Sequence, residues 1–294
     1  MKLLTNFTVK EFKDLYKIVE EAISKRVHKD SMISPKTRFL LSLCYCKFNE
    51  KFEMIGFYFG INPSYAERLI HSTISKVSNE LVKEFVRWLS VSDRITDFHV
   101  YNEDFPTLLG SVDATAQLIS RPKKKQKAYY SGKHKIHYIK TQAFVSPVGL
   151  LIHYSKYMEG AMHDFKLFNF SILADMIIEE SEKCQHLLGN PAITLADSVY
   201  QGIAKKIPGA VIPYKKNRDG MLNNEKRMYN RTLSKSRIIV ENWFGRHKSL
   251  GAIIGSKFCL NIDSYQNFWD FCSALTNFHI KKHPLRDFER SSLR

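Results

Sequence analysis

A short apolar run near residue 195 constrains the fold of this chain most strongly. Residues 192–196 read Ala-Ile-Thr-Leu-Ala and lead directly into Asp197. A run this short and this apolar predicts a central β-strand that is covered on both faces. Such a strand needs helices on either side of its sheet, which is the layered arrangement of an α/β domain. Asp197 then falls where a buried strand ends.

The segments around this run supply the other parts of such a domain. The predicted strands span residues 108–119, 135–146, 150–157, 192–197 and 209–214, and the predicted helices span residues 164–183, 227–248 and 264–279. The first three strands are joined by short connections, so an antiparallel trio is the simplest arrangement for them. The order of elements describes an α/β fold of ribonuclease-H-like type, a mixed sheet flanked by helices. We predict this domain over residues 108–294.

The N-terminal part reads as helical throughout. The predicted helices span residues 8–30, 37–48, 52–59 and 62–89. Thr8 followed by Glu11 predicts a capping box for the first of them. The third and fourth helices flank a turn at Gly60, which is typical of a helix-turn-helix unit but also of any small helical packing unit. We predict a small all-α helix-turn-helix domain over residues 1–91 and a polar linker over residues 92–107.

The start of the helix after Gly60 is the part that a helix-turn-helix unit places against DNA. The residues in question are Ser64, Tyr65, Glu67, Arg68 and, further along, His71. The pattern leaves open whether this helix reads bases or merely packs against its neighbours.

The charge balance indicates a polyanionic partner. The chain of 294 residues has 45 Lys and Arg against 29 Asp and Glu, a formal net charge of +16. This excess predicts nucleic acid as the partner ahead of a membrane surface, and general solubility is the weaker alternative. No segment has the apolar length of a membrane span, and the N-terminus does not read as a signal peptide. Five cysteines without a Cys-x-x-Cys pair indicate a reducing, intracellular setting without disulfides or a zinc ribbon.

A basic run lies between the first two predicted strands. It reads Arg-Pro-Lys-Lys-Lys-Gln-Lys over residues 121–127, and Lys133 to Lys135 extend it. The run is a candidate for contacts with phosphates, a nuclear import signal, or a solvated loop. His134 and His137 make a poor zinc site because no cysteine lies near them.

Three acidic residues stand in settings that suit chemistry. Asp113 lies within the first predicted strand, Asp197 ends the central strand, and Glu241 lies in an apolar stretch of the helix over residues 227–248. Ser234 is a candidate N-cap for that helix, and Arg237 lies one turn before Glu241. Each acid alone fits an ordinary cap or ion pair, such as Arg237 with Glu241. Three acids on adjacent strands and a packed helix make that reading less attractive.

Three converging carboxylates would repel one another unless cations held them together. Hard oxygen ligands suit Mg²⁺ or Mn²⁺. Two such ions about 3.5–4 Å apart can hold the attacking and leaving oxygens of a phosphoryl displacement. The pattern therefore predicts a site for divalent cations, with two ions expected.

Several short motifs, in this order, resemble the DDE superfamily endonucleases and transposases of the PIF/Harbinger and IS5-like group. The matching segments are residues 112–115 (Val-Asp-Ala-Thr), 130–135 (Tyr-Ser-Gly-Lys-His-Lys), 160–164 (Gly-Ala-Met-His-Asp), 196–200 (Ala-Asp-Ser-Val-Tyr), 237–245 (Arg-Ile-Ile-Val-Glu-Asn-Trp-Phe-Gly) and 272–278 (Cys-Ser-Ala-Leu-Thr-Asn-Phe). The chain departs from the family pattern at Ala114, Ala196 and Val199, where glycine is usual. His163 and Asp164 match a recurrent motif outside the triad, for which we favour a role in capping the following helix.

The resemblance implies a function and a site. It implies Asp113, Asp197 and Glu241 as the catalytic, metal-binding triad of an enzyme that hydrolyses DNA phosphodiester bonds and joins 3′-hydroxyl ends to target DNA. With the charge pattern it gives these expected DNA contacts: Arg68, Lys123, Lys124, Lys125, Lys133, Lys135, Arg237 and Lys248. It is compatible with a Myb-like partner protein, a homo-oligomer, and a nuclear location in a eukaryote or a cytoplasmic one otherwise. The alternatives are an inactive transposase-derived protein that binds DNA or a partner, and a nuclease that acts on RNA.

Overall fold

The structure is a computed structural model that describes residues 1–25, 31–89, 104–132, 134–216 and 220–286. Lys133 and residues 92–103 of the predicted linker lie outside the described residues. The chain divides into two compact units. The first comprises Met1–Arg87, Gln117–Arg121 and Gly245–Lys282, and the second comprises Trp88–Ala116, Pro122–Phe244 and His283–Arg294.

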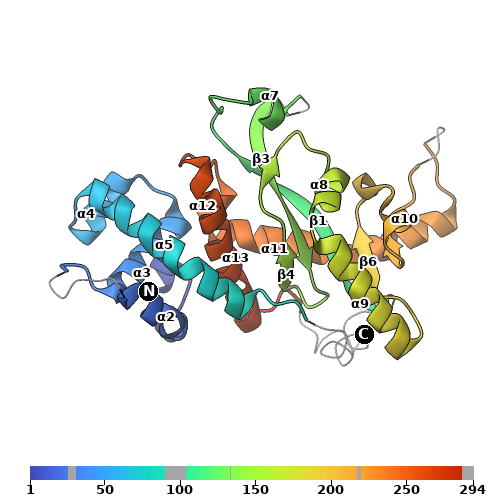
Figure 1. Cartoon of the computed structure of the whole chain (residues 1–294), viewed down its shortest axis with the longest axis horizontal. Helices are drawn as coiled ribbons and strands as arrows, with labels where there is room; N and C mark the ends of the chain where they lie inside the picture. The colour runs from blue at the N-terminus through green and yellow to red at the C-terminus, as the bar shows by residue number, and fades with distance from the viewer. Residues whose placement is uncertain (26–30, 90–103, 133, 217–219, 287–294) are drawn as a thin grey trace. The chain divides into compact units, whose positions relative to one another are not determined.

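The second unit is built on a mixed sheet (Figure 1). Its strands are β1 (Leu108–Leu118), β2 (Tyr130–Ser131), β3 (Ile136–Val145), β4 (Leu151–Tyr154), β5 (Met158–Glu159), β6 (Ile193–Ala196) and β7 (Ala210–Val211). The order is β2-β3-β1-β6-β7, with β4 and β5 also pairing with β3. β6 runs parallel to both β1 and β7, whereas β2, β4 and β5 are antiparallel to β3. The prediction of a mixed α/β sheet is confirmed.

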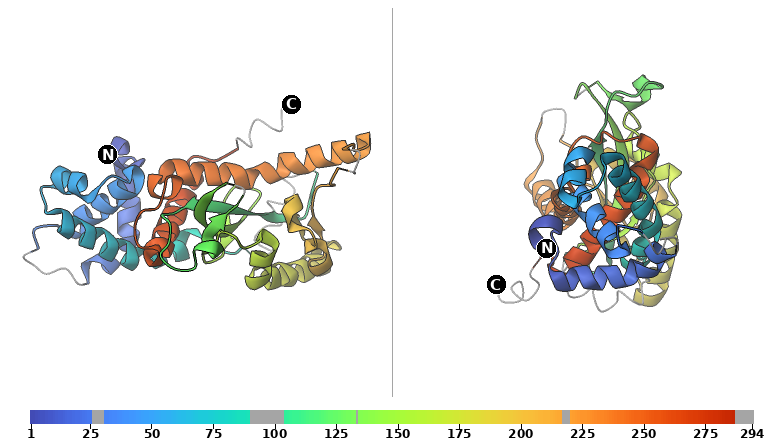
Figure 2. Two further views of the ribbon diagram at one scale, coloured as in Figure 1. Left: turned by 90° about the horizontal axis from the view of Figure 1, so that it is seen from above. Right: turned by 90° about the vertical axis from the view of Figure 1, so that its left-hand side faces the viewer.

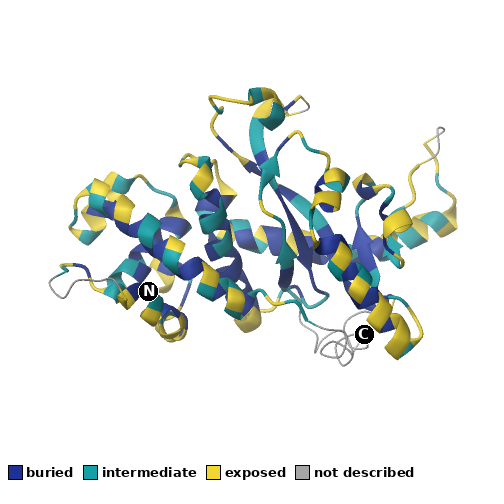
Figure 3. Cartoon of the chain, viewed as in Figure 1, coloured by how far each residue is buried: buried dark blue, intermediate teal, exposed yellow. Residues whose placement is uncertain are grey.

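Helices cover both faces of this sheet (Figure 2). α8 (Asp164–Phe170) and α9 (Leu173–Leu188) lie on one face, and the part of α11 (Asn224–Leu250) within this unit runs along the other. One apolar cluster joins Val112 of β1 to helix residues such as Ile177, and a second joins Leu195 of β6 to Leu233 of α11. β1 and β6 are accordingly buried along most of their length (Figure 3), as the apolar runs predicted. Three short helical turns complete the unit: α7 (Gln126–Tyr129), η1 (Ser198–Tyr200) and α10 (Ile203–Lys206).

Two predicted helices differ in the structure. The single helix expected over residues 164–183 is wrong, because it is two helices that break at Ser171 and Ile172. Ser171 has an extended backbone, and its hydroxyl donates to the carbonyl of Phe168 (2.9 Å), which ends α8. This is the local competition with helix hydrogen bonds that serine offers.

The helix that carries Glu241 begins earlier than predicted. α11 starts at Asn224, and the side chain of Asn223 accepts a hydrogen bond from the backbone N–H of Lys226 (2.9 Å), so Ser234 lies inside the helix and is not its N-cap. Glu241 is also not set within the buried stripe: its side chain is 49% exposed. Leu233, Val240 and Trp243 face the core instead.

Apart from the end of β1 and a β-bridge between Ile119 and Phe258, the described secondary structure of the first unit is helical. It holds α1 (Lys2–Thr5), α2 (Val9–Ser24), α3 (Pro35–Phe48), α4 (Phe52–Phe59), α5 (Pro63–Phe85), α12 (Ala252–Gly255), η2 (Ile262–Ser264) and α13 (Tyr265–Lys282). The predicted capping box of Thr8 and Glu11 is present at α2. α13 packs along α5, since Phe268, Trp269 and Phe271 are fully buried, so the unit takes in C-terminal residues that the predicted domain over residues 1–91 does not include.

The segment predicted as a helix-turn-helix consists of α4, a turn and α5. Gly60 ends α4 in the left-handed conformation (φ 64°), where glycine is favoured, and the Asn62 side chain caps α5. Glu67 and Arg68 are exposed near the start of α5. His71 is half-buried, and its ring packs edge-on against Phe268 (5.4 Å). His71 therefore packs against the core of this unit, whereas Glu67 and Arg68 in the first turns of α5 remain exposed.

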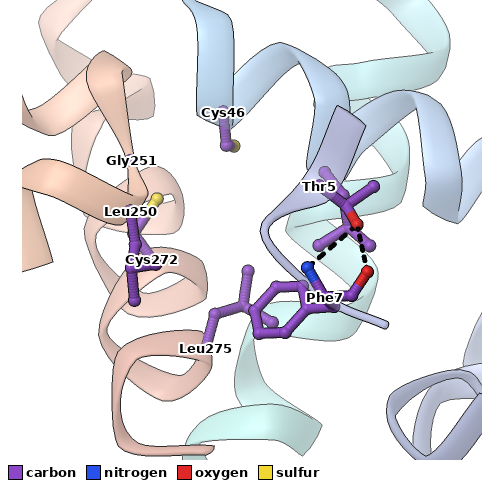
Figure 4. Close-up of a pocket in the computed structure, with 8 residues that line it drawn as sticks. Thr5, Phe7, Cys46, Leu250, Gly251, Cys272 and Leu275 are labelled. Carbon is purple, nitrogen blue, oxygen red and sulfur yellow. Dashed lines mark hydrogen bonds between the residues drawn. The ribbon is translucent and has the colours of Figure 1, made fainter. Parts of the chain in front are cut away.

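The helical unit contains a small cavity that does not qualify as a ligand site. It is lined by residues such as Phe7, Cys46 and Cys272 (Figure 4) and has a volume of about 10 Å³. That is room for at most one water molecule. All five cysteines are free, as predicted. Among the described residues, none of the helices has the length and apolar character needed to cross a bilayer.

Candidate active site

Strand register places two of the predicted acids side by side. Val112 of β1 pairs with Ala196 of β6, and the two strands are parallel. Asp113 follows within β1 and Asp197 follows directly after β6, so the two aspartates lie side by side where β6 ends. The carboxyl ends of strands are where α/β sheets place functional groups.

Local hydrogen bonds orient both aspartates. Asp113 Oδ1 accepts from the N–H of Ala114 (2.8 Å), and Asp197 Oδ1 accepts from the N–H of Ser198 (2.5 Å). Asp197 is the N-cap of η1, so the turn that follows β6 holds its side chain at the end of the strand. These contacts use Oδ1 of each carboxylate, and the second oxygen of Asp113 is taken by Arg237 of α11.

Arg237 of α11 lies between Asp113 and Glu241. Its Nη1 contacts Asp113 Oδ2 at 3.3 Å, and its Nη2 donates a short hydrogen bond to Glu241 Oε1. The guanidinium is 16% exposed and Asp113 is 21% exposed, so this interaction is only partly open to water. Strand register thus places Asp113 next to Asp197, and the guanidinium of Arg237 joins Glu241 to Asp113.

The surroundings of Asp113 disfavour its charge. The pKa of Asp113 is raised from 3.8 to about 6, mainly by burial; the Ala114 N–H and Arg237 act in the lowering direction, and the charges of Asp197 and Asp164 add to the rise. A carboxyl that is buried beside other carboxyls is costly to ionise without a cation. Perturbed pKa values of this kind are typical of functional sites and also occur in structural ion pairs.

A second ion pair lies beside this group, and the sequence did not predict it. Lys140 of β3 contacts Asp164 Oδ1 at 2.7 Å, and also donates to the carbonyl of Met162 (3.0 Å). The predicted capping role belongs to His163, whose Nδ1 accepts from the N–H of Phe165, while Asp164 is the first residue of α8 and pairs with Lys140. The recurrent His-Asp motif was the one available signal for this pair.

A buried tyrosine forms another wall of the site. Tyr200 is fully buried, and its hydroxyl accepts a hydrogen bond from Gln142 Nε2 (3.2 Å). Burial raises the pKa of Tyr200 well above its ordinary value, and the negative charge of Asp113 adds to this. Tyr200 is therefore a neutral, fixed hydrogen-bonding group next to the acids. Nothing in the sequence pattern distinguished it from a core residue.

The donor atoms around Asp113 suit a hard divalent cation. Three carboxylates with few other partners are the ligand type that Mg²⁺ and Mn²⁺ prefer. Among the residues that the structure describes, no three His, Cys, Asp or Glu side chains are close enough to share one metal ion. The guanidinium of Arg237 takes the position between Asp113 and Glu241 instead. The residues therefore fit a cation by their chemistry, and a metal would compete with Arg237 for two of the oxygens.

Most of the predicted DNA contacts are exposed side chains, and two of them are less accessible. Lys123, Lys124 and Lys125 are exposed before α7, and Lys135 is exposed before β3. Arg68 is exposed on α5, with its guanidinium 5.2 Å from the centre of the Tyr65 ring. Arg237 is bound to the acids, and burial lowers the pKa of Lys248, so these two are less accessible than predicted. Lys133 lies outside the described residues.

A parallel pair of strands that presents aspartates beside a helix that presents a glutamate is the arrangement of a DDE-type nuclease domain. Residues 112–277, more than half of the chain, match the family described as "DDE superfamily endonuclease", and the chain belongs to this family. The match spans Asp113, Asp197 and Glu241.

A curated protein of Microchaete diplosiphon, described as "Probable transposase for insertion sequence element IS702", is similar to this chain. The two are 30% identical over 186 residues, which is 63% of this chain and 61% of the relative. The chain thus spans less than two thirds of the length of that relative. No solved structure shows a significant match. The predicted DDE superfamily is confirmed, whereas the PIF/Harbinger and IS5-like subgroup stays a prediction.

Proposed function

We propose that this protein is a metal-dependent DNA endonuclease that acts as a transposase. The observation that carries the proposal is the placement of Asp113 and Asp197 on adjacent parallel strands, next to Glu241 through Arg237, in a chain of the DDE endonuclease family. The net charge of +16 supports DNA as the substrate. The transposase relative supports the same substrate class.

In this proposal each acid has a defined role. Asp113, in the middle of β1, and Asp197, just after β6, would hold divalent cations, and Glu241 of α11 would supply a further ligand. Bound Mg²⁺ or Mn²⁺ supplies activation of the attacking oxygen and charge neutralisation at the phosphate. With cations bound to these acids, Arg237 would give up its contacts with Asp113 and Glu241, and its guanidinium would be available to a phosphate, which is the DNA contact that we predict for it.

The chain's other residues position the reaction. The Ser198 N–H holds Asp197 in one orientation, and Gln142 and Tyr200 form a rigid wall beside the acids. The exposed lysines 123–125 and 135 bind phosphates on either side of the cleavage point, and Arg68 contacts DNA from a helix-turn-helix formed by α4 and α5. The joining of 3′-hydroxyl ends uses the same acids as cleavage. A Myb-like partner, a homo-oligomeric assembly and an intracellular location belong to the same proposal.

Cleavage of supercoiled plasmid tests this function. The protein is expected to nick the plasmid with Mg²⁺ or Mn²⁺ and to leave it intact in EDTA, because the acids cannot act without cations. The products are separated on an agarose gel, with an RNA substrate in parallel. Plasmid binding without nicking under either metal would favour a transposase-derived binding protein. Preferential cleavage of RNA would favour the ribonuclease alternative.

A further inference from the structure

The sheet unit contains a hollow that is not lined by any of the three acids. It lies between the β4–β5 edge and helix α8, and its volume is about 420 Å³. Its walls include His153, Lys156, Met158, Leu167, Phe170 and Ile172. The walls are mainly apolar, with a few polar groups, and a hollow of this size and lining is typical of ligand sites. Neither the family match nor the similar transposase assigns it a role.

The imidazole in this hollow lacks a hydrogen-bond partner. His153 Nδ1 is buried and has none among the described residues. Burial lowers the pKa of His153 from 6.5 to about 4, so the ring is neutral at pH 7. A neutral imidazole has one donor and one acceptor nitrogen, and a buried one without a partner is costly. Because this nitrogen has no exposed surface, it lies behind the wall of the hollow, and the ring gives the hollow a neutral side.

The mouth of the hollow combines an aromatic ring with positive charge. Phe170 is 67% exposed, and Ile172 beside it is 66% exposed. The ammonium of Lys166 lies 5.8 Å from the centre of the Phe170 ring, and Lys156 is exposed at the rim. No Asp or Glu lines the hollow. Exposed aromatic rings next to lysines are the features by which proteins bind unpaired nucleotides, through base stacking and phosphate contacts.

The hollow is connected to the acid cluster by α8 and by a chain of side chains. α8 begins at Asp164, which pairs with Lys140 beside Asp113, and ends at Phe170 in the mouth. Its seven residues span about 10 Å, close to three base steps of DNA. Ser171 Oγ in the wall lies 3.4 Å from Gln142 Oε1, and Gln142 Nε2 donates to the hydroxyl of Tyr200 (3.2 Å). α8 therefore links the neighbourhood of the acids to the Phe170 ring over a length comparable to a few nucleotides.

We propose that this hollow is a subsite for one unpaired nucleotide of the DNA. The base stacks on the exposed ring of Phe170, and the flanking phosphates lie against Lys156 and Lys166. This inference rests on the proposed function only in taking DNA as the ligand, and it does not need cleavage. The competing occupant is an apolar side chain of a protein partner.

The test compares two DNA duplexes that differ in a single base. Each carries one extra nucleotide in one strand, a normal adenosine in the first and an abasic residue in the second. Binding is measured by fluorescence anisotropy in EDTA at fixed salt. The wild-type protein is expected to bind the adenosine duplex about tenfold more tightly, since stacking on an aromatic side chain contributes about 1–3 kcal/mol per base.

Phe170→Ala is expected to abolish this preference while changing affinity for the abasic duplex less than twofold. Phe57→Ala, which removes an exposed aromatic ring of α4 (80% exposed), is the matched control and keeps the preference. Circular dichroism melting confirms that both variants fold. No preference in the wild-type protein, or a preference that survives Phe170→Ala, overturns the subsite and leaves the hollow to a protein side chain. Plasmid nicking by a protein without the preference would leave the proposed function standing, so the two failures are distinguishable.

Discussion

Replacing Asp197 with asparagine is expected to reduce metal-dependent DNA cleavage by a factor of about 10³ or more, a loss of roughly 4 kcal/mol of transition-state stabilisation. Asparagine keeps an oxygen for the N–H of Ser198, so η1 should retain its position. The change removes only the charge that would hold a cation. Cleavage rates on plasmid and affinity in EDTA are measured on the same preparation, and affinity should change less than twofold.

Asp175→Asn is the control for this variant. Asp175 is an exposed acid in the first turn of α9 in the same unit, and its charge is not among those that shift the pKa of Asp113, so its loss removes one negative charge without changing the acid cluster. Full cleavage is expected from it. An Asp197→Asn protein that still cuts, or one that loses cleavage and DNA binding to the same extent, would show that Asp197 does not hold the cation.

The second large effect is an increase in the free energy of unfolding. Asp113→Asn is expected to stabilise the metal-free protein by about 1–2 kcal/mol at pH 8, although it should be inactive. The pKa of Asp113 is raised to about 6, so folding penalises its ionised form. That penalty is absent below pH 3.8, builds as the pH rises to 6, and is complete above it. The expected gain in stability is smaller than the full pKa shift would give, because asparagine loses the charge that pairs with Arg237.

Urea unfolding in EDTA at pH 4 and pH 8 measures this effect, with a gain expected only at pH 8. Arg237→Gln is the matched comparison and should destabilise the protein at pH 8 by about 1–3 kcal/mol, because Asp113 and Glu241 then lose their shared cation. A destabilised Asp113→Asn protein at pH 8, or a gain independent of pH, would mean that this carboxylate is an ordinary ion-pair partner.

The sequence allowed the central part of the sheet to be predicted because its signals are local. The apolar runs of β1 and β6 have no alternative to burial, and an acid within or directly after such a run has few structural uses. Asp113 and Asp197 could therefore be found without any three-dimensional information. Their adjacency depends on parallel pairing, and the structure shows that pairing directly.

The features that could not be predicted depend on contacts between distant segments. The Lys140–Asp164 pair joins residues that are 24 positions apart, and Gln142 and Tyr200 are 58 apart. The exposed position of Glu241 depends on which face of α11 packs on the sheet, and Ser234 resembled an N-cap only because residues 224–233 were not recognised as helical. The burial of α13 against α5 likewise depends on tertiary packing, which a helical pattern alone does not identify.

The central claim is that Asp113, Asp197 and Glu241 form a site for divalent cations. Titration of the protein with Mn²⁺ by isothermal calorimetry, without DNA, tests it most directly. We predict saturable binding by the wild-type protein and by Asp175→Asn, and strongly weakened binding by Asp197→Asn. Equal Mn²⁺ affinity in all three proteins, or no binding by the wild type, would contradict it.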